Sequence, residues 1–114
     1  MKFGESPSTG DGSDSHSTLT YAATTDIDLA STDSFRTVTL TGNITFTTSN
    51  RAAGLSRTIR IIGDGSTRTF TFLAWKFVGG AAPASLAANK IAALAITAFG
   101  TADTDIVAAY SAEA

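Results

Sequence analysis

Few residues of this 114-residue chain could do chemistry, and the most suggestive are two aspartates. Asp26 and Asp28 lie two positions apart in the stretch D-I-D-L-A, so a β-strand would place both on one face. Paired carboxylates can act as acid and base in glycoside hydrolysis. No base, nucleophile or metal ligand accompanies this pair, so we interpret it as a charged outer face that protects an edge strand from unwanted pairing.

Nucleophilic and metal chemistry find little support elsewhere in the sequence. The only histidine, His16, lies in a polar stretch where we expect it to be solvated, and cysteine is absent, which excludes disulfides and thiolate sites. Asp11 and Asp14 resemble the start of a calcium loop, but the required glycine and terminal glutamate spacing is missing. We therefore predict no catalytic residues, no cofactor and no metal site, and a protein that is not an enzyme.

Composition narrows the range of partners. The net charge is −2, so bulk electrostatics do not indicate nucleic acid as a partner. No apolar run approaches the roughly 18 residues of a membrane span, and the N-terminus lacks the basic-then-apolar pattern of a secretion signal. Long aliphatic side chains are few for this length. A core this thin indicates a domain that gains stability by assembling with copies of itself or with another surface.

The elements that must position any site are organised around Arg36–Thr48, where apolar residues and threonines alternate. The even positions are apolar: Val38, Leu40, Ile44 and Phe46. A tight hairpin at Gly42-Asn43 would pair Leu40 with Thr45 and split the apolar set between two faces. We therefore predict one long strand, bent or bulged at Gly42, with its even side buried.

Residues 57–62 and 67–72 read as a hairpin. Pairing residue 61 with 70 and 59 with 72 gathers Ile59, Ile61, Phe70 and Phe72 on one face. The same pairing places Arg60 and Thr71 together on the outer face. A bulge or corner is expected at Leu73-Ala74, where the alternation changes phase before Trp75.

The remaining segments complete an all-β pattern of eight or nine short strands. Residues 18–23, 26–30 and 105–111 read as strands, 91–99 as a central strand covered on both faces, and 81–90 as either a short helix or a loop crossing one end. We predict an antiparallel β-sandwich or jelly-roll-like domain over residues 18–114, preceded by a flexible polar arm over residues 1–17. The expected core comprises Leu19, Tyr21, Ile27, Leu29, Val38, Leu40, Ile44, Phe46, Ile59, Ile61, Phe70, Phe72, Trp75, Phe77, Leu94, Ile96, Ile106 and Val107.

Four stretches carry a resemblance to a known family. They are V-T-L-T-G-N-I-T-F (38–46), N-R-A-A-G (50–54), I-I-G-D-G-S-T-R-T-F-T-F (61–72) and W-K-F-V-G-G-A-A-P (75–83). Together they resemble a β module of tailed-bacteriophage virion proteins, notably of tail-fibre and receptor-binding chains, over about residues 19–110. The resemblance implies a location in the virion, self-assembly often as trimers, and no catalysis. Unlike the usual module, we expect this domain to form a whole short protein with a polar N-terminal arm and not one module of a long fibre.

A small β domain with an N-terminal arm is similar in size and layout to capsid decoration (cement) proteins. This similarity implies a partner in the major capsid protein or another virion protein, a homotrimer on the capsid surface, and no nucleic-acid or membrane partner. The arm would order on that partner, with Met1, Lys2 and Phe3 at its contact. The alternative is a tail-fibre or adhesion module that binds a host receptor or glycan, with Trp75 as an exposed aromatic platform; the competing interpretation of Trp75 is a core residue.

Overall fold

The computed structural model describes residues 15–114, and this part of the chain is built from strands. The expected all-β class is confirmed, since a single 3₁₀ turn at Asp103–Asp105 is the only helical element in residues 15–114. The strands of this region are β2 (His16–Thr18), β3 (Thr24–Asp28), β4 (Phe35–Thr39), β5 (Ile44–Ser49), β6 (Ser56–Ile62), β7 (Arg68–Phe72), β8 (Lys76–Phe77), β9 (Ser85–Leu86), β10 (Ile91–Ala98) and β11 (Ile106–Ala112).

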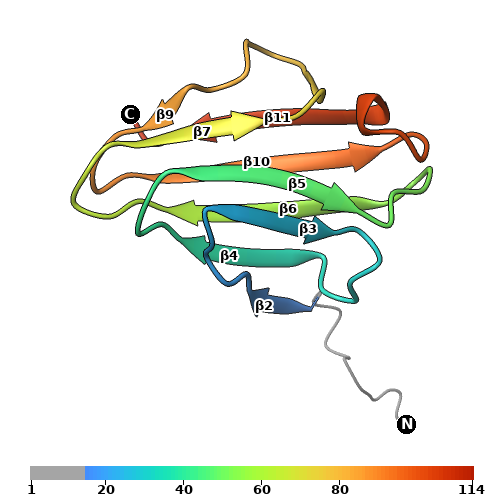
Figure 1. The fold of residues 1–114 in the computed structure, drawn as a ribbon, viewed down its shortest axis with the longest axis horizontal. Helices are drawn as coiled ribbons and strands as arrows, with labels where there is room; N and C mark the ends of the chain where they lie inside the picture. The colour runs from blue at the N-terminus through green and yellow to red at the C-terminus, as the bar shows by residue number, and fades with distance from the viewer. Residues whose placement is uncertain (1–14) are drawn as a thin grey trace, which may run out of the picture.

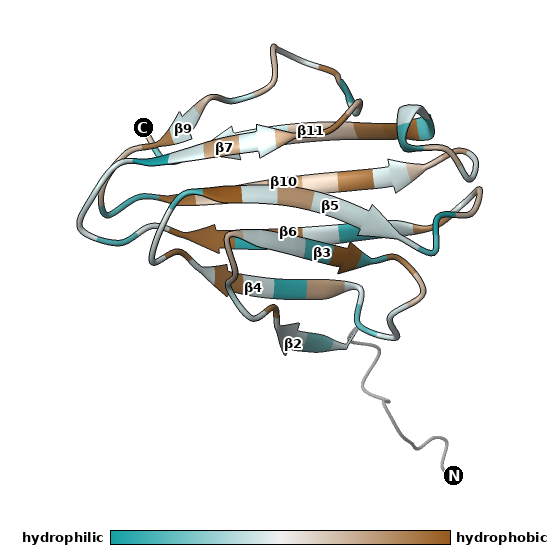
Figure 2. Ribbon diagram, viewed as in Figure 1, coloured by the Kyte–Doolittle hydropathy of each residue, from teal (hydrophilic) through white to brown (hydrophobic). Residues whose placement is uncertain are grey.

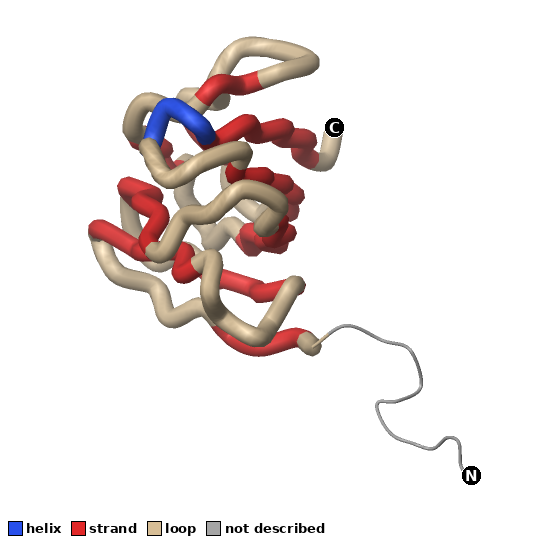
Figure 3. The backbone as a smooth tube through the Cα atoms, turned by 90° about the vertical axis from the view of Figure 1, so that its right-hand side faces the viewer, coloured by secondary structure: helices blue, strands red, loops and turns tan. Residues whose placement is uncertain are grey.

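The strands form two mixed sheets that face each other across one core (Figures 1 and 3). A six-stranded sheet has the order β2-β4-β6-β10-β11-β8, and a four-stranded sheet has the order β3-β5-β7-β9. From β2 to β7 the chain changes sheet at every strand, and each new strand lies beside the one formed two strands earlier. This part of the chain is therefore wound in three successive coils.

Strand direction differs from the antiparallel arrangement that the sequence suggested. The strand pairs β2-β4, β4-β6, β3-β5, β5-β7 and β8-β11 are parallel, and antiparallel pairing is found at β6-β10, β10-β11 and β7-β9. The expected hairpin between residues 57–62 and 67–72 is wrong, because β6 and β7 belong to different sheets. Arg60 and Thr71 consequently lie on opposite outer surfaces of the domain.

The stretch Arg36–Thr48 is two strands and not one long bent strand. β4 ends at Thr39 in the six-stranded sheet, and β5 begins at Ile44 in the four-stranded sheet. The prediction that the even positions are buried is confirmed: Val38, Leu40, Ile44 and Phe46 are at most 2% exposed. A chain that crosses between facing sheets keeps the same alternate side chains turned toward the core, which explains why the burial pattern continues across the corner at Gly42.

The core runs between the sheets, and apolar and polar residues alternate along its strands (Figure 2). Of the predicted core, fourteen residues are buried, and Tyr21, Phe72 and Phe77 are partly buried against them. The prediction that Val107 belongs to the core is wrong, because alternation along β11 turns its side chain to the outer side of the sheet. The buried residues Leu86, Ala92, Ala98 and Ala108 were not predicted. Rings from the two sheets meet directly, with the centroids of Phe70 and Tyr110 5.7 Å apart.

Three further expectations change with the structure. β10 is an interior strand of its sheet, but its residues alternate between exposed and buried, so only one of its faces is covered. Residues 81–90 contain β9 and a turn, and no helix. The expected arm over residues 1–17 overlaps β2, which already includes His16 and Ser17. No helix within residues 15–114 is long and apolar enough to cross a membrane.

Candidate functional site: the outer face of the six-stranded sheet

The surface of the six-stranded sheet that points away from the core, here called the outer face, carries small side chains at its centre. Ala93 and Ala95 of β10 are exposed, as are their cross-strand partners Ser111 and Ala109 of β11. Alternation along β10 and β11 turns these four side chains outward while their sequence neighbours fill the core. The result is a patch of short side chains on β10 and β11, which borders Arg60 of β6 beside Ala93.

Large apolar residues lie around this flat centre. The side chains of Phe35 on β4 and Ile91 on β10 are 42% and 40% exposed, and both lie on the outer side of their strands. Phe99, just after β10, is 66% exposed. Single exposed apolar residues are ordinary on protein surfaces, but a group of them around one flat patch is typical of an interaction surface.

An open pocket of about 500 Å³ lies at the β2 end of this face. Its lining residues come from β2, β4 and β6: His16, Phe35, Arg36, Thr37, Thr58 and Arg60. The Thr37 side chain is only 9% exposed, and its Oγ1 accepts a hydrogen bond from Arg60 Nε (3.3 Å). The same oxygen is 2.8 Å from His16 Nε2, in a hydrogen bond whose donor depends on the histidine tautomer. Thr37 therefore holds an imidazole and a guanidinium side by side.

Arg36 also lines the pocket, but its guanidinium is engaged at the edge of the sheet. Its Nε donates to Ser17 Oγ (3.1 Å) and its Nη2 donates to the carbonyl oxygen of Thr18 (3.2 Å). These contacts occupy polar groups of the edge strand β2 and hold it against β4. Arg60 is therefore the cation that the pocket offers to a ligand.

The sequence placed His16 in a solvated stretch and gave Arg60 no role, so both pocket residues were missed. The signal that was present is the odd-numbered side of β4, where Phe35 and Thr37 share one face by alternation. That pattern alone could not reveal which strands lie on either side of β4. Because β2 and β6 are its parallel neighbours, His16 pairs with Phe35 and Thr37 pairs with Arg60 in the sheet register.

Trp75 is a core residue and not an exposed platform. Its side chain is 6% exposed, its ring packs near Phe72 at a centroid distance of 5.3 Å, and its Nε1 donates to Asp103 Oδ1 at 3.0 Å. Asp103 Oδ2 also accepts a hydrogen bond from the backbone N–H of Ala74 (2.6 Å). The burial of the ring removes the aromatic surface on which the glycan-binding hypothesis depended. The other predicted contact residues, Met1, Lys2 and Phe3, lie outside the described residues, as do Asp11 and Asp14.

Asp26 and Asp28 lie on the edge strand β3 of the four-stranded sheet, as their interpretation as an edge-protecting pair requires. Asp26 accepts hydrogen bonds from the hydroxyls of Thr47 (2.8 Å) and Ser49 (2.5 Å) on the neighbouring strand. Asp28 Oδ1 accepts from Asn50 Nδ2 (2.8 Å), and this bond is the main cause that lowers the pKa of the Asp28 carboxyl. Both carboxylates thus bind side chains on or just after the neighbouring strand β5 and hold β3 against it.

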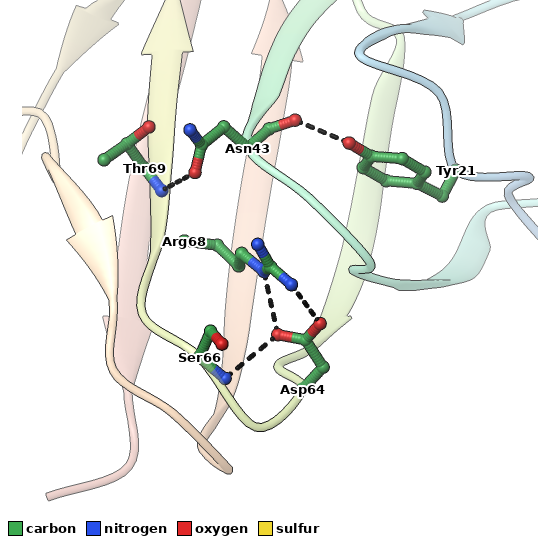
Figure 4. Close-up of polar contacts among 6 residues, drawn as sticks. All are labelled: Tyr21, Asn43, Asp64, Ser66, Arg68 and Thr69. Carbon is green, nitrogen blue, oxygen red and sulfur yellow. Dashed lines mark hydrogen bonds and ion pairs between the residues drawn. The ribbon is translucent and has the colours of Figure 1, made fainter.

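A second polar cluster holds together the corners where the chain crosses between sheets (Figure 4). The Tyr21 hydroxyl donates to the carbonyl oxygen of Asn43 (2.7 Å), and Asn43 Oδ1 accepts from the backbone N–H of Thr69 (3.0 Å). Arg68 binds Asp64 through two hydrogen bonds of 2.9 and 2.6 Å. These contacts join the corners of successive coils, and their groups satisfy one another, so the cluster is structural.

Groups of three or more histidine, cysteine, aspartate or glutamate side chains placed to hold a metal ion are absent from residues 15–114. No protein family, curated protein or solved structure matches this chain. The candidate site is therefore defined by geometry alone: the outer face of the six-stranded sheet, with its flat small-residue centre, its apolar rim and its cationic pocket.

Proposed function

We propose that this protein is a bacteriophage virion structural protein, and specifically a capsid decoration protein that binds the outer shell and stabilises it. The observation that carries the proposal is the outer face of the six-stranded sheet, an exposed patch of small side chains centred on Ala93, Ala95 and Ala109. The short side chains of β10 and β11 on this face cost little side-chain entropy to cover, and small residues let a partner backbone approach closely. The sequence resemblance to virion β modules supports the same role.

The size of this face suits a protein that binds in many copies. The strands β4, β6, β10 and β11 are five to eight residues long. At a spacing of about 4.8 Å they give a patch of roughly 400 Å². That is about half of what one partner contributes to a typical stable protein interface, so a single contact would be weak. A shell displays many equivalent sites, and a homotrimer would engage several together, which raises the overall affinity. The proposed partner is the major capsid protein or another virion protein, with no nucleic acid and no membrane involved.

We also propose a finer architecture for the domain. It is a two-layer β-sandwich whose first half is wound as parallel coils and whose second half closes one end with antiparallel strands. The alternation of β2 to β7 between the sheets supports this winding, and the five parallel strand pairs argue against a jelly roll, which is built from antiparallel Greek keys. The centre of the outer face lies on β10 and β11, in the antiparallel part of the six-stranded sheet.

The role can be tested by heating purified shells with and without the protein. Shells that carry it should withstand a higher temperature, and shells without it should regain that resistance when purified protein is added back. Equal survival temperatures in both preparations would refute stabilisation of the shell.

A matched pair of variants tests whether the outer face makes the contact. Ala109→Lys introduces a long cation at the centre of the outer face, and Thr71→Lys introduces the same group on the exposed surface of the other sheet. We expect Ala109→Lys to reduce shell binding at least tenfold and Thr71→Lys to leave it unchanged, with both variants melting near the parent temperature. Equal binding by the two variants would place the contact elsewhere on the molecule.

Copy number in the virion separates the shell from the tail. Hundreds of copies would support a position on the capsid surface, whereas a few copies or a few tens would support the alternative, a tail-fibre or adhesion module. Quantitative mass spectrometry of purified particles gives this number directly.

A further inference from the structure

We propose that the pocket beside β2 binds a carboxylate of an acidic peptide segment on the partner protein, an inference that rests on the proposed docking role of the same face. The pocket brings together the guanidinium of Arg60, the imidazole of His16 and the hydroxyl groups of Thr37 and Thr58. No carboxylate lines it among the residues that the structure describes. This composition attracts an anion.

Arg60 is already positioned for a bidentate contact. Within residues 15–114 its guanidinium makes one hydrogen bond, from Nε to Thr37 Oγ1, and its two terminal amino groups have no partner there. Two parallel N–H groups match the two oxygens of a carboxylate, and such charge-assisted pairs are stronger than neutral hydrogen bonds. Because Thr37 is almost fully buried, its hydroxyl fixes the Nε end of the guanidinium and reduces the entropy lost on binding.

The surroundings favour a peptide over a free inorganic anion. The Phe35 ring, 42% exposed, supplies an apolar wall, and about 500 Å³ is far more space than a phosphate ion fills. In the sheet register the neighbour of Arg60 on β10 is Ala93, so the pocket borders the small-residue centre of the outer face. An extended segment carrying one acidic residue next to an apolar one would place its carboxylate on Arg60 and its apolar side chain on Phe35.

Glu113, an acidic residue of the described part of the chain at the end of the same sheet, does not fill this role. Glu113 follows β11, and its Oε1 accepts a hydrogen bond from the backbone N–H of Ile91 (2.7 Å). Ile91 lies opposite Ile62 in the register, two positions further along β6 than Arg60. The carboxylate of Glu113 is thus committed to the end of β10, so it does not supply the acidic group for Arg60.

The test uses the full-length protein and a synthetic probe, the peptide acetyl-Gly-Ser-Leu-Glu-Leu-Ser-Gly-amide. Titration followed by ¹H–¹⁵N NMR should give saturable shifts at the amides of Thr37, Thr58 and Arg60 and at Arg60 Nε. We expect the same peptide with glutamine in place of glutamate to bind at least tenfold more weakly. Equal affinities for the two peptides would overturn the proposal, and so would tighter binding of inorganic phosphate to the same residues.

Variants at Arg60 provide the matched controls. Arg60→Gln should weaken the glutamate peptide at least tenfold, and Arg60→Lys, which keeps the charge but loses the paired N–H groups, should have an intermediate effect. Lys76→Gln removes a cation from β8, the opposite edge strand of the same sheet, and should change the affinity less than twofold. Unchanged binding by Arg60→Gln would refute the assignment.

Two outcomes separate this inference from the proposed function. If wild-type protein and Arg60→Gln bind shells equally, the pocket has no part in docking and the inference fails while the decoration role stands. If wild-type protein does not bind shells at all, the decoration role fails, whatever the peptide does. Shifts of the pocket amides that depend on protein concentration without peptide would show that a second copy of this chain fills the pocket, and would overturn the choice of partner.

Discussion

Replacing Asp103 by alanine should destabilise the domain through the buried tryptophan. The carboxylate accepts one hydrogen bond from Trp75 Nε1 and another from the backbone N–H of Ala74. The indole is 6% exposed, so water cannot easily replace the lost acceptor. Ala74 is exposed, and its N–H can be hydrated. The main cost is therefore one unpaired indole N–H.

The loss of stability can be calculated from this one unpaired N–H group. An unsatisfied buried donor costs about 1–3 kcal/mol, and a hydrogen bond to a charged group contributes about 1.5–3 kcal/mol. We expect Asp103→Ala to lower the free energy of unfolding by about 2–3 kcal/mol. For a domain of this size, about 4 °C of melting temperature corresponds to 1 kcal/mol, so the melting temperature should fall by roughly 10 °C. Asp103→Asn keeps one acceptor oxygen, so its melting temperature should fall about half as far.

Thermal melts followed by circular dichroism measure the stability, and fluorescence reports on the site itself. Trp75 is the only tryptophan, so a red shift of its emission in Asp103→Ala would show water reaching the indole. The control is Asp33→Ala, in a turn between β3 and β4, where the carboxylate makes no hydrogen bond with any residue from 15 to 114; it should melt within about 2 °C of the parent. A melting temperature within 2 °C for Asp103→Ala, with unchanged emission, would refute the reasoning.

Three further predictions test other parts of the fold. A Cβ at Gly42 would clash with the Tyr21 hydroxyl, so Gly42→Ala should lower the free energy of unfolding by about 1 kcal/mol in the parent and leave it unchanged or raised in Tyr21→Phe. A double-mutant cycle by urea denaturation measures this coupling, and additive effects of the two substitutions would contradict it. The Tyr110 hydroxyl is buried without a partner among the described residues, so Tyr110→Phe should melt no lower than the parent. Burial raises the pKa of Tyr110, so the parent protein, but not Tyr110→Phe, should lose stability through this group as the pH rises above about 10 toward the raised pKa. The hydrogen bond from Arg68 is the main cause that lowers the pKa of Asp64. The Asp64 carboxylate therefore stabilises the fold above the ordinary aspartate pKa, and this contribution is lost as the pH falls through the lowered pKa. Asp64→Asn should flatten the plot of stability against pH below about pH 4, and an unchanged plot would count against the Arg68–Asp64 pair.

The alternation of residue types predicted burial well and strand pairing poorly. Val38 and Phe46 face the core as expected, because a period of two fixes which side chains share a face. The same rule misplaced residues 91–99, where apolar alanines on the exposed side of β10 suggested a strand covered on both faces. Alanine is small enough to occur on either side, so its presence carries little information about burial.

The candidate site was harder to predict because it depends on the neighbours of a strand. Arg60, Thr37 and His16 come from three strands separated by about twenty residues each, and only the parallel register brings them together. Trp75 shows the opposite case. Its neighbours in the run W-K-F already indicated a core position, and the structure places it there.

The parallel winding itself could not be derived, because a short connection between two strands has more than one solution. Residues 59–62 and 70–72 would keep their apolar sides together either as a hairpin within one sheet or as a crossing between two facing sheets. For β4 and β5 the phase excludes the hairpin, but it fits one long bent strand and a crossing between two sheets equally well. A sequence repeat of constant length would have revealed the parallel winding, but the coils differ in length. Thr24 pairs with Thr45 and Ile44 with Phe70, which are separations of 21 and 26 residues. Coils of unequal length keep the stacking in space while removing a fixed period from the sequence.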